Sequence, residues 1–470
     1  MFPDRSEFEA ALKSAHDKAA DFLSGVDLRP PGVIVERPPS VGLSEDGAGS
    51  IGALDELWIR YGDLFSGSSG PRYWGFIQGG LTPAALAGDW LCSAIDQTGQ
   101  MHGDSPSVFI ERDAIAMLRE LFGLPEAYSG NFVSGGTMAN AVGLAIGLQA
   151  LGSARGVNVS EQGIGALGPV KIVSGEAHAS IGQAAAMLGL GRSCVERLPL
   201  LDRRERVSSD AMRARLRELE GASLIVVGNA GTVNTGDIDD LEALADLAEE
   251  HDAHFHVDGA FGLFAAAAPS HAHLMKGIDR AGTIASDAHK WLNVPYGSGF
   301  VFTRHLDHQI AMFQSPSAYL PPTSVDLLAF QNMSPENSRR LRALPAWIAL
   351  RAYGRSGYRE LVERGCALAE LFGQGIGTEP GFRLLAPVRL NVVCFQLLDE
   401  AAPADGERTR EFVERIKQDG RLVVSRSVLW GEPCIRAALL NWRTSEADID
   451  IAMTALREVR EAMSSKGDSR

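Results

Sequence analysis

The stretches Phe255-His256-Val257-Asp258 and Ser286-Asp287-Ala288-His289-Lys290-Trp291 decide the fold. The first is a short apolar run that ends on a carboxylate, and the second places a lysine just after a small polar turn. Around them, from about Tyr73 to Thr303, short apolar runs alternate with Ala/Leu-rich segments of helical length. This alternation predicts an α/β fold with a mainly parallel sheet covered by helices on both faces. Ligand sites in such folds gather at the carboxyl ends of the strands.

Further strands are predicted outward from this centre, at 170–174, 224–227 and 299–302. Residues 313–338 lack periodicity and are rich in Pro, Ser and Asn, which is typical of a functional loop. Helical and strand patterns resume after this segment and predict a smaller α+β domain. We therefore expect three parts, namely an N-terminal helix and linker at 1–72, a large α/β domain that carries the site at 73–343, and the small domain at 344–470.

Lys290 and Asp258 are suited to hold pyridoxal phosphate. The lysine amine can bind the aldehyde of this cofactor covalently. A carboxylate at a strand end can keep a proton on the pyridine nitrogen, so that the ring accepts electrons from a bond that breaks at the substrate's α-carbon. Each residue alone has an ordinary alternative, since Asp258 could cap a helical turn and Lys290 could lie on the surface.

Two further segments fit the same cofactor. Ser134-Gly135-Gly136-Thr137 lies between a strand-like run and an Ala/Leu-rich helix, so its backbone N–H groups can hold a phosphate, although paired glycines are often only a tight turn. His178 follows a strand and opens an Ala-rich helix, where its ring could stack on a cofactor or bond the helix start. The four elements follow one another through one α/β domain, and this combination favours a pyridoxal phosphate site.

The composition argues against several classes of function. The chain has 470 residues and a net charge of -15, which disfavours binding to nucleic acid or to an anionic membrane surface. No apolar run approaches the roughly 20 residues of a membrane-spanning helix. The five cysteines lie outside any metal-ligand spacing, so we expect reduced core residues and no metal site. The first residues lack a signal-peptide pattern, and a cytoplasmic location is expected.

The motifs together resemble those of the pyridoxal-phosphate-dependent decarboxylases of the aromatic-amino-acid and glutamate decarboxylase family. The similarity extends from about Arg72 through the C-terminal domain. It rests on Ser134-Gly135-Gly136-Thr137, Ala177-His178, His256-Val257-Asp258-Gly259-Ala260, Asp287-Ala288-His289-Lys290-Trp291 and Ser338-Arg339-Arg340-Leu341-Arg342. The resemblance implies an aspartate-aminotransferase-like fold and a homodimeric lyase of amino acid metabolism. Its reaction would be the decarboxylation of an L-amino acid to the amine and carbon dioxide.

The resemblance also implies a role for each matching residue. Lys290 would bind the aldehyde, Asp258 would pair with the pyridine nitrogen, and His178 would stack on the ring. Tyr319 matches a loop tyrosine that protonates the α-carbon in this family, whereas relatives with phenylalanine there produce aldehydes. The implied cofactor contacts are Gly136, Thr137, His178, Thr232, Asp258, Ala260, Asp287, His289 and Lys290.

Two departures from the family pattern bear on affinity and on the substrate. Asp287 stands where the family usually has asparagine, which places a negative charge near the phosphate. The segment Arg72 to Gly80 retains only part of the aromatic pattern of the family's substrate pocket, so packing in the core is the alternative for its aromatic residues. An aromatic L-amino acid is the favoured substrate and a small or acidic one the next. The candidate substrate contacts are Trp74, Phe76, Gln78, His102 and Arg339.

Rival functions use the same residues and differ in the product. An aminotransferase, a carbon-carbon lyase or an oxidative decarboxylase would also need Lys290 and Asp258. A non-enzymatic binding protein is the rival from another class, and the intact set of Lys290, Asp258, His178 and Tyr319 argues against it. The N-terminal amphipathic helix at 8–23 is expected to lie at the interface of the homodimer.

Overall fold

The larger part of the molecule is built on a seven-stranded sheet. The computed structural model describes residues 7–36, 38–97, 105–314, 329–398 and 405–464. The strand order is β1-β7-β6-β5-β4-β2-β3, in which β7 runs opposite to its two neighbours and the pairs from β6 to β3 are parallel. The strands are β1 (Ser129–Val133), β2 (Val170–Ser174), β3 (Val195–Arg197), β4 (Ser223–Asn229), β5 (His254–Asp258), β6 (Thr283–Asp287) and β7 (Gly299–Thr303). The predicted mainly parallel α/β fold is confirmed.

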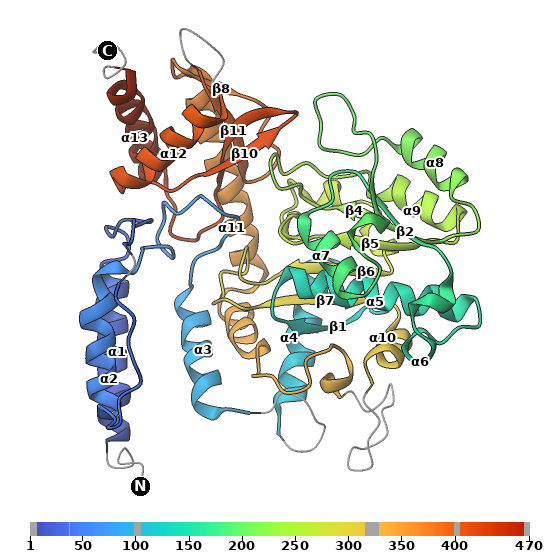
Figure 1. The fold of residues 1–470 in the computed structure, drawn as a ribbon, viewed down its shortest axis with the longest axis horizontal. Coiled ribbons are helices and arrows are strands. Elements are labelled where there is room, and N and C mark those ends of the chain that lie inside the picture. Colours follow the sequence, from blue (N-terminus) through green and yellow to red (C-terminus); the bar gives the residue numbers. More distant parts are fainter. Residues whose placement is uncertain (1–6, 37, 98–104, 315–328, 399–404, 465–470) are drawn as a thin grey trace.

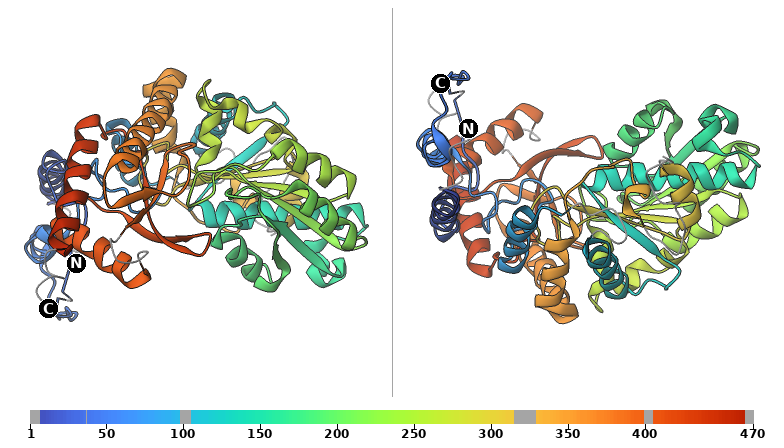
Figure 2. Two further views of the ribbon diagram at one scale, coloured as in Figure 1. Left: turned by 90° about the horizontal axis from the view of Figure 1, so that it is seen from above. Right: turned by 90° about the horizontal axis from the view of Figure 1, so that it is seen from below.

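Helices cover both faces of this sheet, as alternate residues along β4 show. Ile225 and Val227 pack with α5 (Gly136–Ala154) and α7 (Ala179–Met187). Leu224 and Val226 point to the other face, which is covered by α4 (Ser107–Leu121), α8 (Ser209–Glu218) and α9 (Leu241–Glu250). Every residue of β4 and β5 is buried, as expected for central strands of a parallel sheet that is covered on both faces. Figures 1 and 2 show the sheet between its two helical layers.

A second, four-stranded antiparallel sheet lies beside the first and has the order β10-β11-β9-β8. Its elements are β8 (Phe382–Leu384), β9 (Val392–Leu397), β10 (Ser425–Leu429), β11 (Glu432–Ala438), α12 (Gly406–Asp419) and α13 (Glu446–Ser464). Their core contains Phe372, Phe395 and Phe412. This is the smaller α+β part that the sequence predicts, and in Figure 1 it lies at the orange and red end of the chain.

One long helix, α11 (Ala343–Thr378), joins the two parts. Leu344 and Leu350 belong to the core of the large sheet, whereas Leu368 and Phe372 belong to the core of the small one. The helix kinks at Gly354, where φ is 59° and the absence of a Cβ removes the strain of a left-handed residue. The predicted boundary at 343/344 stays a prediction, because α11 begins there and contributes to both cores.

The N-terminal helices lie on the outside of the small part. They are α1 (Phe8–Ser24) and α2 (Gly49–Tyr61), and neither has a buried residue. Figures 1 and 2 show them side by side at the edge of the molecule, while α3 (Pro83–Ile95) lies beside α11. Among the described residues, no helix combines the length and the apolar character that crossing a membrane requires.

Candidate active site

The predicted cofactor residues meet at the carboxyl edge of the large sheet. β5 ends on Asp258, β6 ends on Asp287, and the segment after β1 opens α5 at Gly136. A cavity of about 320 Å³ lies among them, and an adjoining cleft of about 590 Å³ shares several of its residues. Of the predicted contacts, the cavity is lined by Gly136, Thr137, His178, Ala260, Asp287, His289 and Lys290, and the cleft by Thr232, Asp258, His178, Ala260, His289 and Lys290.

Asp258 is 5% exposed and receives two hydrogen bonds from neutral groups. The backbone N–H of Ala260 donates to Oδ1 at 3.2 Å, and Asn140 Nδ2 donates to Oδ2 at 2.9 Å. A buried carboxylate needs a cationic or strongly donating partner to offset its lost hydration. A pyridinium N–H is such a partner, so the chemistry of Asp258 fits pyridoxal phosphate.

Lys290 follows β6 in a turn that two glycines support from outside the sheet. Its Nζ lies 2.9 Å from Asp287 Oδ2 and 5.8 Å from the ring centre of Phe261. Gly79 passes so close that a Cβ there would lie 1.9 Å from the carbonyl oxygen of Lys290. The N–H of Gly80 donates to Asn293 Oδ1 at 2.8 Å, just after the lysine. Gly79 and Gly80 therefore both contact the turn that presents the lysine, a function that sequence analysis did not assign to them.

The turn before α5 brings backbone donors to the same cavity. Gly135 has a φ of 155°, which favours glycine, and Gly136 N–H donates to Asp287 Oδ1. A Cβ at Gly136 would lie 2.5 Å from Asp287 Oδ2, so the site requires glycine. Because the N-terminus of a helix attracts anions, this turn fits a phosphate group, and in this structure the Asp287 carboxylate lies against it.

Two histidines border the cavity. His178 is the residue before α7, and its Nδ1 accepts hydrogen bonds from the Ser180 N–H at 3.3 Å and from the Ser180 hydroxyl at 2.8 Å. His289 Nδ1 lies 2.8 Å from the carbonyl oxygen of Ser298, to which it donates. Burial lowers the pKa of His289, and the adjacent Asp287 carboxylate opposes this shift only in part.

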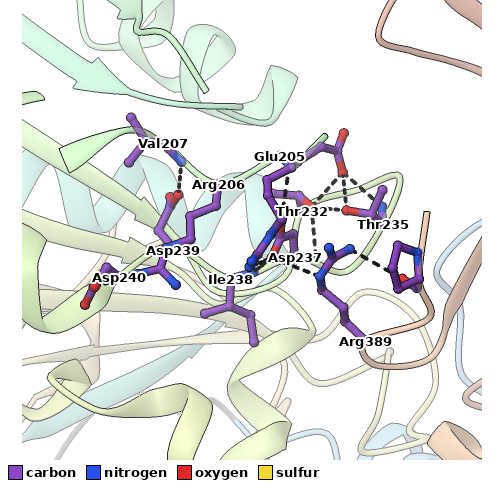
Figure 3. Close-up of polar contacts among 12 residues, drawn as sticks. Glu205, Arg206, Val207, Thr232, Thr235, Asp237, Ile238, Asp239, Asp240 and Arg389 are labelled. Atoms are coloured by element: carbon purple, nitrogen blue, oxygen red, sulfur yellow. Dashed lines mark hydrogen bonds and ion pairs between the residues drawn. The ribbon is translucent and has the colours of Figure 1, made fainter. Parts of the chain in front are cut away.

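Thr232 lies on a loop that is held by buried charges, as Figure 3 shows. Its hydroxyl donates to Glu205 Oε2 at 2.7 Å, and the backbone N–H and hydroxyl of Thr235 donate to the same oxygen at 2.9 and 2.8 Å. Asp237, on the same loop, accepts two hydrogen bonds of 2.6 Å from Arg204. The Thr232 side chain thus holds its loop in place, because its hydroxyl donates its one hydrogen bond to Glu205.

The predicted substrate contacts fall in different places. Phe76 lines the cleft and is 62% exposed. Trp74 is 1% exposed and packs on Phe372 in the small core, so the core alternative is the correct one for this residue. Gln78 donates to the carbonyl oxygen of Ser68 at 3.2 Å and is not among the residues that line the cleft.

Arg339 is also placed away from the cleft. Its side chain is 1% exposed, and its Nη2 lies 2.9 Å from both carboxylate oxygens of Glu111 on α4. This buried ion pair ties the segment before α11 to α4, and its position corrects the prediction of a substrate contact. The remaining predictions, His102 and Tyr319, lie outside the described residues.

Arg436 is a residue of the cleft that sequence analysis missed. It lies on β11, is 7% exposed, and donates to the carbonyl oxygens of Val233 and Gly75 at 3.0 and 3.2 Å. Its Nε is buried without a hydrogen-bond partner among the described residues, and burial lowers its pKa. The available signal was a single arginine within the apolar run Cys434 to Ala437. A charged side chain is rarely buried in a strand unless it has a partner or a ligand.

Comparison with known proteins gives the family. The model described as "Pyridoxal-dependent decarboxylase conserved domain" matches residues 65–398. The aromatic-L-amino-acid decarboxylase of Bacillus atrophaeus is 28% identical over 405 residues, which cover 84% of this chain and 82% of that protein. The L-2,4-diaminobutyrate decarboxylase of Rhizobium meliloti (strain 1021) is 29% identical over 385 residues, covering 80% and 74% of the two chains.

Solved structures show the same fold. The crystal structure of Oryza sativa TDC with PLP and tryptamine superposes with a TM-score of 0.87 at 21% identity, covering 98% of this chain and 99% of that one. The crystal structure of mouse CSAD gives a TM-score of 0.85 at 23% identity, with 97% and 99% covered. At this level of identity the structures establish the shared architecture alone.

Proposed function

This chain belongs to the pyridoxal-dependent decarboxylase family, and we propose that it converts an aromatic L-amino acid to the corresponding amine and carbon dioxide. It is a carboxy-lyase that uses pyridoxal phosphate. The observation that carries the proposal is the placement of Lys290 and Asp258 along one cleft. A covalent amine and a buried carboxylate are the two groups that this cofactor chemistry needs from the protein.

When bound, pyridoxal phosphate supplies an electron sink for the bond that breaks at the α-carbon. Lys290 would hold the cofactor through its side-chain amine. Asp258 would keep the ring nitrogen protonated, and His178, at the start of α7, would lie against the ring. The N-terminus of α5, with Gly136 and Thr137, would hold the phosphate. Ala260 and His289 complete the wall of the cavity.

Arg436 is the group that we assign to the substrate carboxylate. It is cationic, buried and part of the cleft that contains Lys290, and its Nε has no partner among the described residues. A guanidinium binds a carboxylate through paired donors, which fixes the direction of the bond to be broken. Tyr319 is proposed as the proton donor to the α-carbon, because a tyrosine with an ordinary pKa is protonated at neutral pH.

The preference for an aromatic substrate rests on the apolar side of the cleft. Phe76, Phe261 and Tyr296 line it, and two of them are largely exposed, with Phe76 at 62% and Tyr296 at 60%. Exposed aromatic rings beside a reactive lysine offer a stacking surface to an aromatic side chain. Relatives in the family are named for aromatic amino acids, diaminobutyrate and cysteine sulfinate, so a small or acidic amino acid is the second candidate.

The test is a screen of the twenty standard amino acids for carbon dioxide release by the protein loaded with pyridoxal phosphate. We expect an aromatic amino acid to give carbon dioxide and amine in equal amounts. A keto acid would indicate transamination, and an aldehyde with hydrogen peroxide would indicate oxidative decarboxylation. Borohydride reduction followed by peptide mapping should place the label on Lys290. A label on another lysine, or no visible absorption band, would contradict the site.

A homodimer is part of the proposal. α1 and α2 have no buried residue, and Phe8, Leu12 and Ile59 are 67%, 57% and 87% exposed. Exposed apolar side chains on two adjacent helices are typical of a surface that a second subunit covers. The expected cytoplasmic location remains a prediction.

A further inference from the structure

A column of buried polar side chains runs beneath the active site along β5. His254, His256 and Asp258 alternate along the strand and therefore share one face, which is turned toward α5. Two helix glycines make room for the imidazoles. A Cβ at Gly143 would lie 2.5 Å from His256 Cε1, and a Cβ at Gly147 would lie 2.5 Å from His254 Cδ2. Since glycine inside a helix costs about 1 kcal/mol relative to alanine, the column is a built feature of the fold.

The column is continuous. Thr283 on β6 lies opposite His256, and its Oγ1 is 2.9 Å from His254 Nε2 and 2.8 Å from His256 Nδ1. His256 Nε2 is 3.0 Å from Asn140 Oδ1. The Asn140 amide in turn donates to Asp258 Oδ2 at 2.9 Å. His254 is 6% exposed, and the other members are between 0 and 5% exposed.

The contacts of Asn140 fix the direction of every bond in the column. An ionised Asp258 can only accept, so Asn140 turns its NH₂ toward the carboxylate and its oxygen toward His256. His256 must then carry its proton on Nε2. Burial lowers the pKa of His256 to about 4, so the ring is neutral at pH 7 and its Nδ1 accepts from the Thr283 hydroxyl. The carbonyl oxygen of Gly143 is a more distant acceptor for this hydroxyl, at 3.4 Å. Because the single hydroxyl proton is directed to His256, His254 Nε2, which is 2.9 Å away, donates to the Thr283 oxygen.

The same amide controls a second branch. Asn140 Nδ2 also donates to Ser180 Oγ at 2.9 Å. The Ser180 hydroxyl can therefore donate a hydrogen bond to His178 Nδ1, which is 2.8 Å away. His178 Nδ1 also accepts a hydrogen bond from the Ser180 backbone N–H. Two donors directed at Nδ1 require a lone pair there, so the proton of His178 lies on Nε2.

We propose that Asn140 is a positioning residue that sets the orientation of Asp258 and the tautomer of His178 together, with His256 and Thr283 holding its amide in place. The inference rests on the cofactor roles proposed above for Asp258 and His178. One amide thus aligns the carboxylate that holds the ring proton and the imidazole that covers the ring. Such preorganisation lets both groups meet the cofactor without reorientation.

The first test reads the tautomers directly. The full chain is labelled with ¹⁵N-histidine, and long-range ¹H–¹⁵N spectra are recorded at pH 7 with and without pyridoxal phosphate. We expect His256 and His178 to show the Nε2–H tautomer before the cofactor is added. A proton on Nδ1 of His256 would mean that the amide points the other way and would overturn the proposal. This result is independent of catalytic activity, so it separates the proposal from the assigned function.

The second test uses variants of matched shape. Asn140→Leu removes both branches, and Gln149→Met removes another buried amide of α5 that bonds Asn158 and Ser160 far from the cofactor residues. We expect Asn140→Leu to change the His178 signals and to lower kcat by roughly 10- to 100-fold, the factor for one hydrogen bond to a charged group. Gln149→Met should change neither.

Thr283→Val keeps the volume of the threonine and removes its bonds to His254, His256 and the carbonyl oxygen of Gly143, while Asn140 stays in place, so it tests the column if Asn140→Leu does not fold. We expect the His256 signals to shift and kcat to fall by less than in Asn140→Leu. The affinity for pyridoxal phosphate, titrated by absorbance, should also fall by less in Thr283→Val than in Asn140→Leu. If both variants bind the cofactor, absorb and turn over like the parent protein, Asn140 has no positioning function.

Discussion

At the scale of single residues, Asp287 is the side chain that most directly opposes the cofactor. Its carboxylate accepts a hydrogen bond from the first N–H of α5, which is a donor that a phosphate group could use. It also lies 2.9 Å from Lys290 Nζ, the amine proposed to bind the aldehyde. A carboxylate and a phosphate within a few ångströms repel each other, because both are negatively charged at neutral pH. We therefore expect the Asp287 carboxylate to lower the affinity for the phosphate group of the cofactor.

We expect Asp287→Asn to tighten the binding of pyridoxal phosphate by about tenfold, which corresponds to about 1.4 kcal/mol. Absorbance titration of cofactor-free protein measures the dissociation constant. Asp307→Asn is the control, since that carboxylate is 72% exposed on α10 (Leu306–Phe313) and its loss removes the same charge. Weaker binding by Asp287→Asn would show that the carboxylate assists the cofactor.

His256 gives the stability of the protein a defined dependence on pH. Burial lowers its pKa from 6.5 to about 4, so the unfolded chain binds a proton between these values that the folded chain does not. The free energy of unfolding should therefore fall as the pH falls from 6.5 to 4. His256→Gln should make this slope shallower by up to about 1.4 kcal/mol per pH unit.

Thermal or denaturant unfolding between pH 4.5 and 7 measures the effect. His16→Gln serves as the control, because it makes the same change at a side chain that is 61% exposed. Equal slopes for the parent protein and His256→Gln would mean that the imidazole is protonated inside the fold.

At the scale of elements, the loop between β4 and α9 connects the two sheets. Asn234 donates to Glu205 Oε1 at 2.9 Å and to the carbonyl oxygen of Val428 on β10 at 3.3 Å. Glu205 is 2% exposed and accepts four hydrogen bonds from this loop. The carboxylate therefore holds both the loop of Thr232 and the contact of that loop with the small sheet.

Glu205→Gln should destabilise the protein by about 1–3 kcal/mol, because the amide NH₂ would face a group that itself donates. We also expect kcat to fall, since Arg436 is bonded to Val233 of the same loop. Unfolding and carbon dioxide release measure the two effects. Glu218→Gln, at a side chain that is 65% exposed, should alter neither quantity. A stable, fully active Glu205→Gln protein would contradict this function of the carboxylate.

The helices and strands that could be predicted from the sequence are those whose apolar residues recur with a regular spacing. The buried strands around Asp258 and Lys290 and the Gly-Gly turn were placed correctly, because apolar runs and turn residues act locally. Trp74 and Arg339 were misplaced, since their environments depend on Phe372 and Glu111, which are distant in the sequence. Arg436 was missed for the same reason, because its position in the cleft comes from the packing of β11 against the large part.

At the scale of the whole molecule, the exposed apolar side chains of α1 and α2 predict how the protein assembles. Deletion of residues 1–48 should shift a dimer toward a monomer, because it removes the linker and α1, the helix that carries the exposed side chains of Phe8 and Leu12. Light scattering after gel filtration measures the mass. Phe8→Ser with Leu12→Ser is the milder variant, and it should weaken the dimer without removing a helix. A dimer that persists in both proteins would place the interface elsewhere.

The helix α11, which places Leu344 and Leu350 in one core and Leu368 and Phe372 in the other, limits how the molecule can come apart. Neither half can melt while its neighbour keeps its packing, so heating should produce one cooperative endotherm in a calorimeter. Trp291, next to the reactive lysine, lies against the same helix, where a Cβ at Gly365 would come within 2.6 Å of its ring. The coenzyme should therefore be released at the temperature at which the chain loses its order, and two separated heat peaks would show that the halves melt independently.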